Sequence, residues 1–175
     1  AVACREFRIG LGPFGLMNMT GPTIALHSSD YLSEQLSVPR FGGADNMRAL
    51  VESGEMWEVN EDGDCDDEAA RQIKERLMGQ AFAVCSQIVE EGICSMEDVD
   101  RGAKVGLRWT SGPFELANRI GVPEASRMAR EYAELAGLEI PEWFSGRTEP
   151  FGFSYVDVDV DESGIATVLI NRPEA

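Results

Sequence analysis

The ten residues GPFELANRIG, at positions 112–121, occur a second time as GPFGLMNMTG at positions 12–21. Six of the ten positions are identical, and the two stretches lie 100 residues apart. Unrelated amphipathic helices would share the spacing of their apolar residues, but not the Gly-Pro-Phe start, the Leu, the Asn and the closing Gly in one register. The repeat therefore indicates an internal duplication of one structural unit.

The register of the two copies continues downstream with a small slip. Val38-Pro39 and Phe41 in the first copy correspond to Ile140-Pro141 and Trp143 in the second. A long helical pattern precedes Gly-Pro-Phe in the second copy, whereas only residues 1–11 precede it in the first. We therefore expect the first copy to be truncated, without its first helix, and the chain to be the middle of a longer polypeptide.

Helical signals dominate the chain as far as about residue 145. In the longest predicted helix, which starts at Asp67 or Glu68 and stops at Gly92, apolar residues recur at steps of three and four. Its predicted core stripe consists of Ala70, Ile73, Leu77, Ala81, Val84 and Ile88. Further helices are predicted from Pro22 to Leu36, from a cap at Asp45 to Gly54, from a capping box at Ser95 to about Val105, after Gly112, and from Pro123 to Gly137, the last with Ala125, Met128, Tyr132 and Leu135 on its apolar face. The sequence thus predicts an all-α fold built from a duplicated helical domain.

The tail of the chain changes to a period of two. Residues 155–161 alternate strictly, with valines on one side and aspartates on the other, and Ser163-Gly164 turns the chain into a second strand that ends at Ile170. The aspartates could be taken for a metal site, but no partner residue converges on them, so a solvated strand face is predicted. The fold prediction therefore adds a short C-terminal β-hairpin.

Composition argues against several classes of protein. The chain is 43% hydrophobic, has no apolar run as long as a membrane span, and does not begin like a signal peptide, so we expect a cytoplasmic protein without a membrane partner. A net charge of −16 argues against nucleic acid as a partner, because phosphate binding needs clustered basic residues. Only two of the 15 basic residues are lysines, which favours a halophile surface adapted to molar salt over an incidentally acidic one.

Three sequence features resemble ligand sites, but the residues around each of them do not fit such a site. The acidic run 61–68 does not place its glycine and distal Glu at EF-hand positions, so we predict a solvated linker between the copies. The four cysteines, Cys4, Cys65, Cys85 and Cys94, form no Cys-x-x-Cys pair, and the chain has a single histidine, His27, that could join them as a metal ligand. We therefore predict reduced thiols and no metal site. Residues 10–15 fit the dinucleotide fingerprint Gly-x-Gly-x-x-Gly, but the charged residues 5–8 do not resemble a buried parallel strand. In the second copy Thr110 and Glu115 replace the outer glycines, so no nucleotide site is predicted there.

The segment from Glu90 to Asp100, followed by GLRWTSGPFEL at 106–116, resembles the helical C-terminal domain of 3-hydroxyacyl-CoA dehydrogenases. The resemblance covers roughly residues 1–145, as one truncated and one fuller copy. It implies the helical fold of that domain, which is similar to the C-terminal domain of 6-phosphogluconate dehydrogenase.

The last twenty residues resemble the opening strands of an enoyl-CoA hydratase (crotonase) domain, whose first hairpin commonly runs into Leu-Asn-Arg-Pro-Glu-Ala. The matching residues here are LINRPEA at 169–175. Both families act on successive fatty-acyl-CoA intermediates and occur fused in one chain, so the two resemblances imply the central piece of a bifunctional β-oxidation enzyme. The implied division is a truncated first helical repeat at 1–60, an acidic linker at 61–68, a second helical repeat at 69–148, and the start of the crotonase-like domain at 149–175.

The resemblance implies NAD-dependent oxidation of a 3-hydroxyacyl-CoA to the 3-oxoacyl-CoA. In that family NAD and a His–Glu pair act in an amino-terminal domain, so we expect no catalytic or cofactor-binding residue in this chain and no activity from it alone. The helical domain covers the acyl chain and forms dimers, which implies an acyl-CoA substrate and either a homodimer or an intramolecular pseudo-dimer. The residues expected beside the substrate are Gly12, Pro13, Phe14, Gly112, Pro113 and Phe114.

One departure from the family leaves a rival hypothesis open. The family has an active-site Asn just before an Arg-Leu pair, and the matching place here is Glu75 before Arg76-Leu77. A carboxylate cannot donate a hydrogen bond as an amide does, so the second copy could instead be a non-catalytic structural or assembly module. A dehydrogenase of the wider superfamily, acting on other hydroxy acids, is a third alternative that the crotonase-like tail disfavours. Asn18 and Asn118 stand where the family more often has Asp, and we predict turn or capping roles for them.

Overall fold

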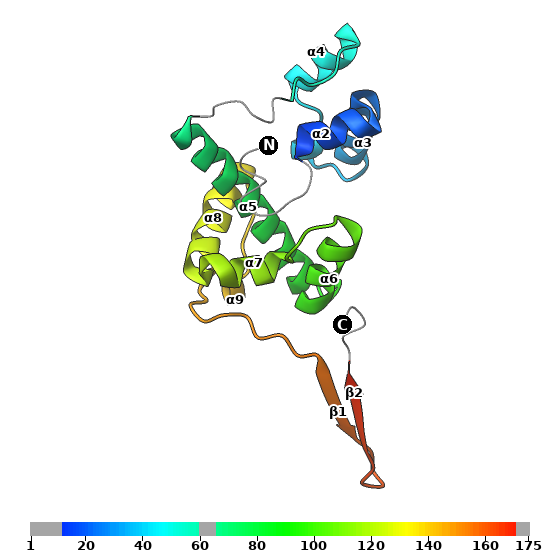
Figure 1. Ribbon diagram of the computed structural model, residues 1–175, viewed down its shortest axis with the longest axis vertical. Helices are drawn as coiled ribbons and strands as arrows, with labels where there is room; N and C mark the ends of the chain where they lie inside the picture. Colours follow the sequence, from blue (N-terminus) through cyan, green and yellow to red (C-terminus); the bar gives the residue numbers. More distant parts are fainter. Residues whose placement is uncertain (1–11, 60–65, 171–175) are drawn as a thin grey trace.

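The computed structural model describes residues 12–59 and 66–170, which form helices followed by a two-stranded antiparallel hairpin (Figure 1). The all-α prediction with a terminal hairpin is confirmed for this part of the chain. Several predicted features lie wholly or partly outside the described residues. They are the Gly-x-Gly start at Gly10, most of the acidic linker, Cys4, Cys65, and the Asn-Arg-Pro-Glu-Ala end.

The first unit contains α2 (Pro13–Thr20), α3 (Pro22–Gln35), the 3-10 turn η1 (Pro39–Phe41) and α4 (Asp45–Ser53). Each of the first three begins with proline, whose fixed φ suits the first helical position and whose missing N–H is not needed there. Asp45 does not cap α4, because the N-cap is Ala44 and Asp45 lies in the first turn. A carboxylate there still interacts favourably with the positive end of the helix dipole.

A salt bridge joins α3 to α4 in the first unit. Asp30 accepts hydrogen bonds from both terminal nitrogens of Arg48, at 2.7 and 2.6 Å, and from the backbone N–H of Gly43 at 3.0 Å. The Arg48 guanidinium holds the pKa of Asp30 below its usual value. Because both side chains are partly exposed, we assign this pair an orienting role and little net stability.

The second unit contains α5 (Asp67–Glu90), α6 (Met96–Gly106), α7 (Pro113–Ile120), α8 (Val122–Ala136) and the short α9 (Glu142–Ser145). Two of its helices are capped by the side chain of their own N-cap residue. Asp66 accepts from the N–H of Ala69 at 2.8 Å, and Ser95 accepts from the N–H of Asp98 at 3.1 Å. The helices α5 and α8 cross with the closest packing of the described elements, and α7 and α9 lie against them.

The core of the second unit differs from the predicted stripe of α5. The buried residues of α5 are Met78, Gly79, Phe82, Ala83 and Ser86, whereas Ile73 is exposed and the other predicted stripe positions that the structure describes are at most half-buried. The buried face is therefore rotated away from the most regular aliphatic pattern. Small residues decide this, because a Cβ on Gly79 would collide with the backbone carbonyl of Met128 in α8.

The apolar face predicted for α8 is also corrected at one end. Ala125 and Met128 are buried and Tyr132 is half-buried, but Leu135 is exposed. Leu135 lies in the last turn of α8, beyond the region that the core covers.

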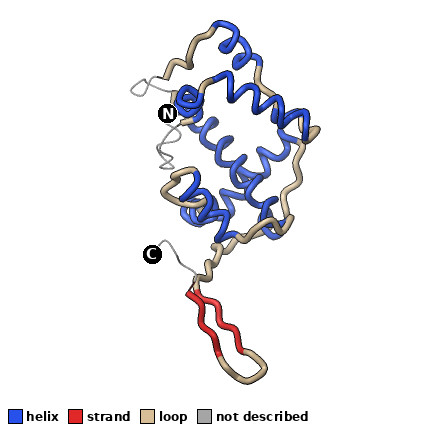
Figure 2. The backbone as a smooth tube through the Cα atoms, turned by 90° about the vertical axis from the view of Figure 1, so that its right-hand side faces the viewer, coloured by secondary structure: helices blue, strands red, loops and turns tan. Residues whose placement is uncertain are grey.

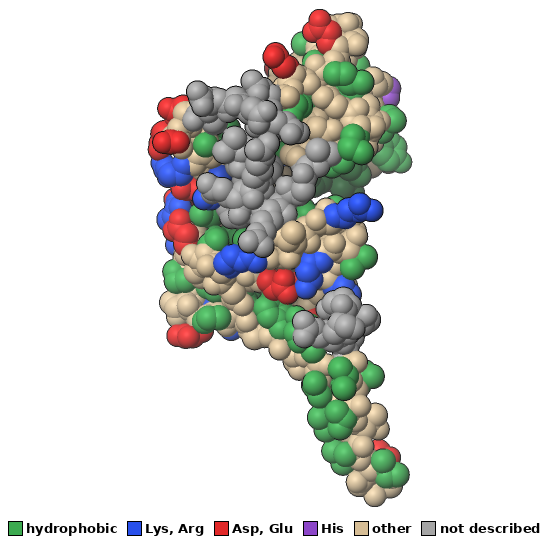
Figure 3. All heavy atoms as spheres, viewed as in Figure 1, with side chains coloured by type: hydrophobic (Ala, Val, Ile, Leu, Met, Phe, Trp, Pro, Cys, Tyr) green, Lys and Arg blue, Asp and Glu red, His purple; other side chains and the backbone are tan. Residues whose placement is uncertain are grey.

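The hairpin pairs β1 (Val156–Val160) with β2 (Ala166–Ile170). Cross-strand pairs such as Val158 with Val168 and Val156 with Ile170 place aliphatic side chains on one face, as predicted. The hairpin extends away from the helices, and hydrophobic side chains cover the face visible in Figure 3 (Figures 1–3). All ten strand residues are exposed, so its apolar face lies uncovered in the described part of the chain.

The substantial contacts among described elements lie within the first unit, within the second unit, or within the hairpin. Figure 2 shows the helices gathered in one part of the molecule and the hairpin pointing outward from them. Within the described ranges, no helix has both the length and the apolar character needed to cross a membrane.

Candidate functional site

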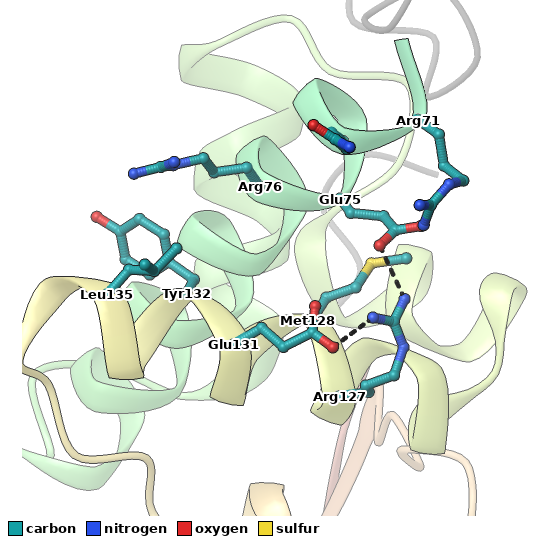
Figure 4. A pocket seen from close by; sticks show the side chains of 9 residues that line it. Arg71, Glu75, Arg76, Arg127, Met128, Glu131, Tyr132 and Leu135 are labelled. Atoms are coloured by element: carbon teal, nitrogen blue, oxygen red, sulfur yellow. Dashed lines mark hydrogen bonds and ion pairs between the residues drawn. The ribbon is translucent and has the colours of Figure 1, made fainter. Parts of the chain in front are cut away.

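Glu75, on α5, lies between two arginines. Arg71, one turn earlier on α5, approaches its carboxylate at 2.8 Å, and Arg127, on α8, approaches it at 3.1 Å. Figure 4 shows Glu75 and Arg127 pointing toward one another from the two helices, while Arg76 points away from them. The contact therefore depends on the packing of α5 against α8.

Further carboxylates surround the two arginines. Arg71 also pairs with Glu68, and Arg127 pairs with Glu124 and Glu131, at N···O distances of 2.6 to 2.7 Å. Burial acts to raise the pKa of Glu75, but the hydrogen bonds from Arg71 and Arg127 outweigh it and lower the pKa below the usual range. Glu75 is thus an ionised hydrogen-bond acceptor at neutral pH. It has no proton to donate as a general acid.

Two cavities flank this ion cluster. One, of about 420 Å³, lies along α5 and α8 and is lined by Arg76, Tyr132 and Leu135 in addition to the cluster (Figure 4). The other, of about 380 Å³, extends toward α7 and is lined by Lys74, Leu116, Arg119, Ile120, Glu124 and Met128 besides Arg71 and Glu75. The second combines three cationic side chains with two carboxylates and several aliphatic side chains. Such a lining can hold an anionic group beside an apolar one.

A buried carboxylate supports the start of α7. Asp100, on α6, accepts hydrogen bonds from the backbone N–H groups of Phe114 and Glu115, both at 2.8 Å. Gly112 has no side chain with which to cap α7, so Asp100 supplies the cap from another helix. Glu115 accepts in turn from the N–H of Gly112 at 3.1 Å.

Burial raises the pKa of Asp100 to about 6, although the two backbone hydrogen bonds act in the opposite direction. The same contact explains why position 112 is a glycine, since a Cβ there would collide with Asp100. Asp100 is thus a structural group that faces the helix start. It lines neither of the two cavities.

The predicted substrate residues of the second copy lie inside the protein. Gly112, Pro113 and Phe114 are buried, and the Phe114 ring packs against Phe144 and Phe151 with centroids 6.3 and 5.1 Å away. None of the three lines either cavity. Any effect of Phe114 on a ligand would therefore act through the position of α7.

The corresponding residues of the first copy are more accessible. Gly12 is half-buried, Pro13 and Phe14 are exposed, and Phe14 packs its ring on Trp57 at 4.7 Å. The two Gly-Pro-Phe starts belong to different helices, α2 and α7, with different surroundings. Their contact with a substrate stays a prediction.

Asn18 and Asn118 have a role that the turn or capping prediction missed. Asn118 donates to the carbonyl oxygen of Phe151 at 2.9 Å and accepts from its N–H at 2.7 Å. Asn18 makes the same pair of bonds with Trp57, at 2.8 and 3.0 Å. Each amide thus clamps the backbone of an aromatic residue whose ring packs on the Phe of its own Gly-Pro-Phe.

Thiol and metal chemistry find little support in the described ranges. Cys85 and Cys94 are free and half-buried, and burial raises the pKa of Cys85 to about 12, so its thiol stays protonated. In residues 12–59 and 66–170, no three His, Cys, Asp or Glu side chains gather as metal ligands would.

The sequence singles out Glu75 but not its two arginine partners. The spacing of four residues between Arg71 and Glu75 could have predicted their ion pair, whereas Arg127 lies in another helix and could not be predicted. Asp100 belonged to the segment that carried the family resemblance, but its capping role needs α6 to fold against α7.

Comparison with known proteins gives one match. Residues 73–144 match the family model of the 3-hydroxyacyl-CoA dehydrogenase C-terminal domain. The matched segment runs from within α5 to α9 and contains Glu75, Asp100, Arg127 and the second Gly-Pro-Phe. Searches of curated proteins and of solved structures returned no match.

Proposed function

We propose that the chain supplies the helical domain of an NAD-dependent 3-hydroxyacyl-CoA dehydrogenase of fatty-acid β-oxidation. The observation that carries the proposal is the family match over 73–144. That segment supplies most of one hydrophobic core and contains the Asp100 cap of α7. In this proposal the domain closes over an acyl-CoA whose 3-hydroxyl is oxidised to the ketone. A cytoplasmic location belongs to the same proposal.

NAD itself does not fit the described residues. A dinucleotide site needs parallel strands that lead through a glycine-rich turn into a helix, but the described strands form an antiparallel hairpin far along the chain from α2. Gly12 is the N-cap of α2. We therefore place hydride transfer on a separate dinucleotide-binding domain and assign no step of it to this chain.

The first unit, in our proposal, is a second copy of the same repeat. Gly12 and Gly112 have φ values of −70° and −71°, and the closing Gly21 and Gly121 have φ values of 96° and 98°. The asparagine clamps add tertiary support, because they join equivalent residues across 39 and 33 positions. The first copy has α4 inside this interval, which accounts for its greater length.

The hairpin, in the same proposal, begins a crotonase-like domain. Support comes from the LINRPEA sequence and from an aliphatic face that the described helices leave exposed. The proposed division is a helical first repeat, a linker, a second repeat that ends near 148, and this hairpin.

For the substrate we propose the cavity beside α7. Lys74, Arg71 and Arg119 can attract the phosphates of coenzyme A, while Leu116 and Ile120 offer apolar contacts to the acyl chain. Gly12, Pro13 and Phe14 remain proposed contacts at the accessible end of α2. Gly112, Pro113 and Phe114 would position α7, which forms one wall of the cavity.

Calorimetric titration of the full chain with acetoacetyl-CoA tests this proposal. We expect saturable binding that Lys74→Gln weakens several-fold, because it removes a cation from the cavity wall. The chain has one other lysine, Lys104, which pairs with Glu115 outside the cavity, so Lys104→Gln is the matched control. Absence of binding, or equal losses from both variants, would refute the substrate site. With NAD and a 3-hydroxyacyl-CoA, the chain alone should show no turnover.

A second candidate function is a non-catalytic assembly module. The specific observation in its favour is that Glu75 is held by two arginines, where the family has an amide that can hydrogen-bond a substrate. An assembly module would form dimers without binding acyl-CoA. Light scattering combined with the titration separates the two functions.

A further inference from the structure

We propose that Met128 limits the length of the acyl chain that the cavity beside α7 accepts, and that the substrate class is therefore short-chain acyl-CoA. Met128 does this by closing the passage from that cavity, of about 380 Å³, to the neighbouring one, of about 420 Å³. The two are called the α7 cavity and the α5–α8 cavity. The inference rests on the acyl-CoA function proposed above and names the substrate of that same site more closely.

The two cavities share one wall. Three side chains line both of them, namely Arg71 and Glu75 on α5 and Met128 on α8. Figure 4 shows Met128 beside Glu75, at the meeting of the two helices. An acyl chain that enters the α7 cavity and runs along α8 therefore meets this wall before it reaches the α5–α8 cavity.

Met128 is the apolar part of the shared wall. Arg71 and Glu75 approach each other at 2.8 Å, and Arg127 holds Glu75 from α8 at 3.1 Å, so ion pairs fix the charged part. Met128 contributes an unbranched thioether chain that ends in a methyl group. It is 6% exposed and belongs to the same core cluster as Leu116, which also lines the α7 cavity. A shorter side chain at position 128 would therefore open the wall without breaking an ion pair.

The lining of the α7 cavity favours a short acyl chain. Its apolar members are Leu116, Ile120 and Met128, whereas its five other side chains are charged. Methylene groups placed against those charged groups would displace water that hydrates them, which is unfavourable. The apolar contacts that remain are thus few, and Met128 stands at their end.

Apolar surface continues on the far side of the wall. Met128, Tyr132 and Leu135 follow one another at steps of four and three, so they lie on one face of α8, and all three line the α5–α8 cavity (Figure 4). Leu135 is 67% exposed, which leaves its side chain accessible to a ligand. An acyl chain that passed position 128 would bury further methylenes against Tyr132 and Leu135. With Met128 in place, we expect the chain to end before it reaches them.

Calorimetric titration of the full chain with butyryl-CoA and octanoyl-CoA measures the effect as a ratio of two affinities, so that changes in binding of the coenzyme A part cancel. In the parent, octanoyl-CoA should bind at most three-fold tighter than butyryl-CoA. In Met128→Ala it should bind at least ten-fold tighter, because each further buried methylene strengthens binding about four-fold. Met78→Ala is the matched control, since Met78 is buried in the same core cluster but lines neither cavity. Its ratio should equal that of the parent.

A second substitution tests the path of the longer chain. Adding Leu135→Asp to Met128→Ala should return the ratio to the parental value, because the carboxylate removes the apolar surface beyond position 128. Leu107→Asp makes the same change at an exposed site next to α6 and should leave the ratio of Met128→Ala unaltered. Circular dichroism checks folding, and Met128→Val replaces Met128→Ala if the alanine variant unfolds.

The outcomes separate this inference from the function on which it rests. If neither acyl-CoA binds to the parent, both proposals are refuted. Saturable binding with the same ratio in the parent and in Met128→Ala overturns only the role of Met128. The same holds if the parent already binds octanoyl-CoA ten-fold tighter, if Met78→Ala raises the ratio equally, or if Leu135→Asp leaves the raised ratio unchanged.

Discussion

Asp100 links three features of the second unit that look unrelated in sequence. It caps α7 through two backbone N–H groups, it excludes any side chain larger than glycine at position 112, and it is buried beside the helix that carries Phe114. The Gly-Pro-Phe start thus has a structural reason in this unit. Proline supplies the helical φ, and glycine leaves room for the capping carboxylate.

The stability of the chain should depend on the protonation of Asp100. Its pKa is raised to about 6 in the folded state from an ordinary value of 3.8, so the folded state binds more protons between these two pH values. The free energy of unfolding should therefore fall as pH rises from 4 to 6, with about 2–3 kcal/mol from this group, and level off above. Asp100→Asn removes this titration but also loses one cap acceptor, which costs about 1 kcal/mol.

Urea unfolding at pH 4.5 and pH 7.5 measures this effect as a difference between proteins. Asp100→Asn should be clearly less stable than the parent at pH 4.5, and the gap should narrow or reverse at pH 7.5. Asp157→Asn makes the same chemical exchange on the exposed hairpin and is the control. A gap for Asp100→Asn that is the same at both pH values would contradict the expected linkage.

At the scale of elements, α5 and α8 carry the second unit. Their buried faces combine large residues, such as Met78 and Phe82, with small ones, such as Gly79 and Ala129. Close approach of the two backbones at the small residues brings Arg127 to Glu75. The ion cluster and both cavities therefore depend on helix packing.

Gly79→Ala should destabilise the protein by about 1–3 kcal/mol, because the added methyl group collides with the backbone of α8 and forces the helices apart. Gly102→Ala is a matched control in α6, where the added Cβ meets no atom within 4 Å. That variant should instead gain about 0.5–1 kcal/mol from helix propensity. Chemical denaturation measures both changes, and a gain in stability for Gly79→Ala would show that α5 and α8 pack less closely.

At the scale of the whole molecule, carboxylates exceed cations by a wide margin. The chain has 31 acidic and 15 basic residues, so even complete pairing would leave 16 carboxylates without a cation. Several of the cations are shared among acids, as Arg127 is among Glu75, Glu124 and Glu131. Self-repulsion over the surface is the expected result.

Added salt should therefore stabilise the fold. Screening shortens the Debye length to about 3 Å at 1 M, so the melting midpoint should rise from dilute buffer to about that concentration. If the melting midpoint rises further at several molar salt, salting-out of apolar surface such as the hairpin face contributes in addition to screening. Thermal melts in potassium chloride measure the effect. If the midpoint stays flat or falls, the acidity is incidental and the halophile interpretation fails.

Local sequence determined most of the helix boundaries. Gly54 and Gly137 end their helices with left-handed φ values, Ser95 caps α6, and the alternation after Tyr155 forms the hairpin. These features depend on residues within a few positions of one another, where backbone sterics and local hydrogen bonds act. They could therefore be predicted without knowledge of the packing.

Only the tertiary structure decided which residues meet. Asn118 clamps Phe151 from 33 residues away, Asp100 caps α7 from 14 and 15 residues away, and Arg127 reaches Glu75 from another helix. The buried face of α5 likewise follows Gly79 and its close contact with α8, while the more regular aliphatic stripe remains partly exposed. The physical reason is that periodicity reports which side of a helix is apolar, whereas shape complementarity between two helices selects the side that is buried.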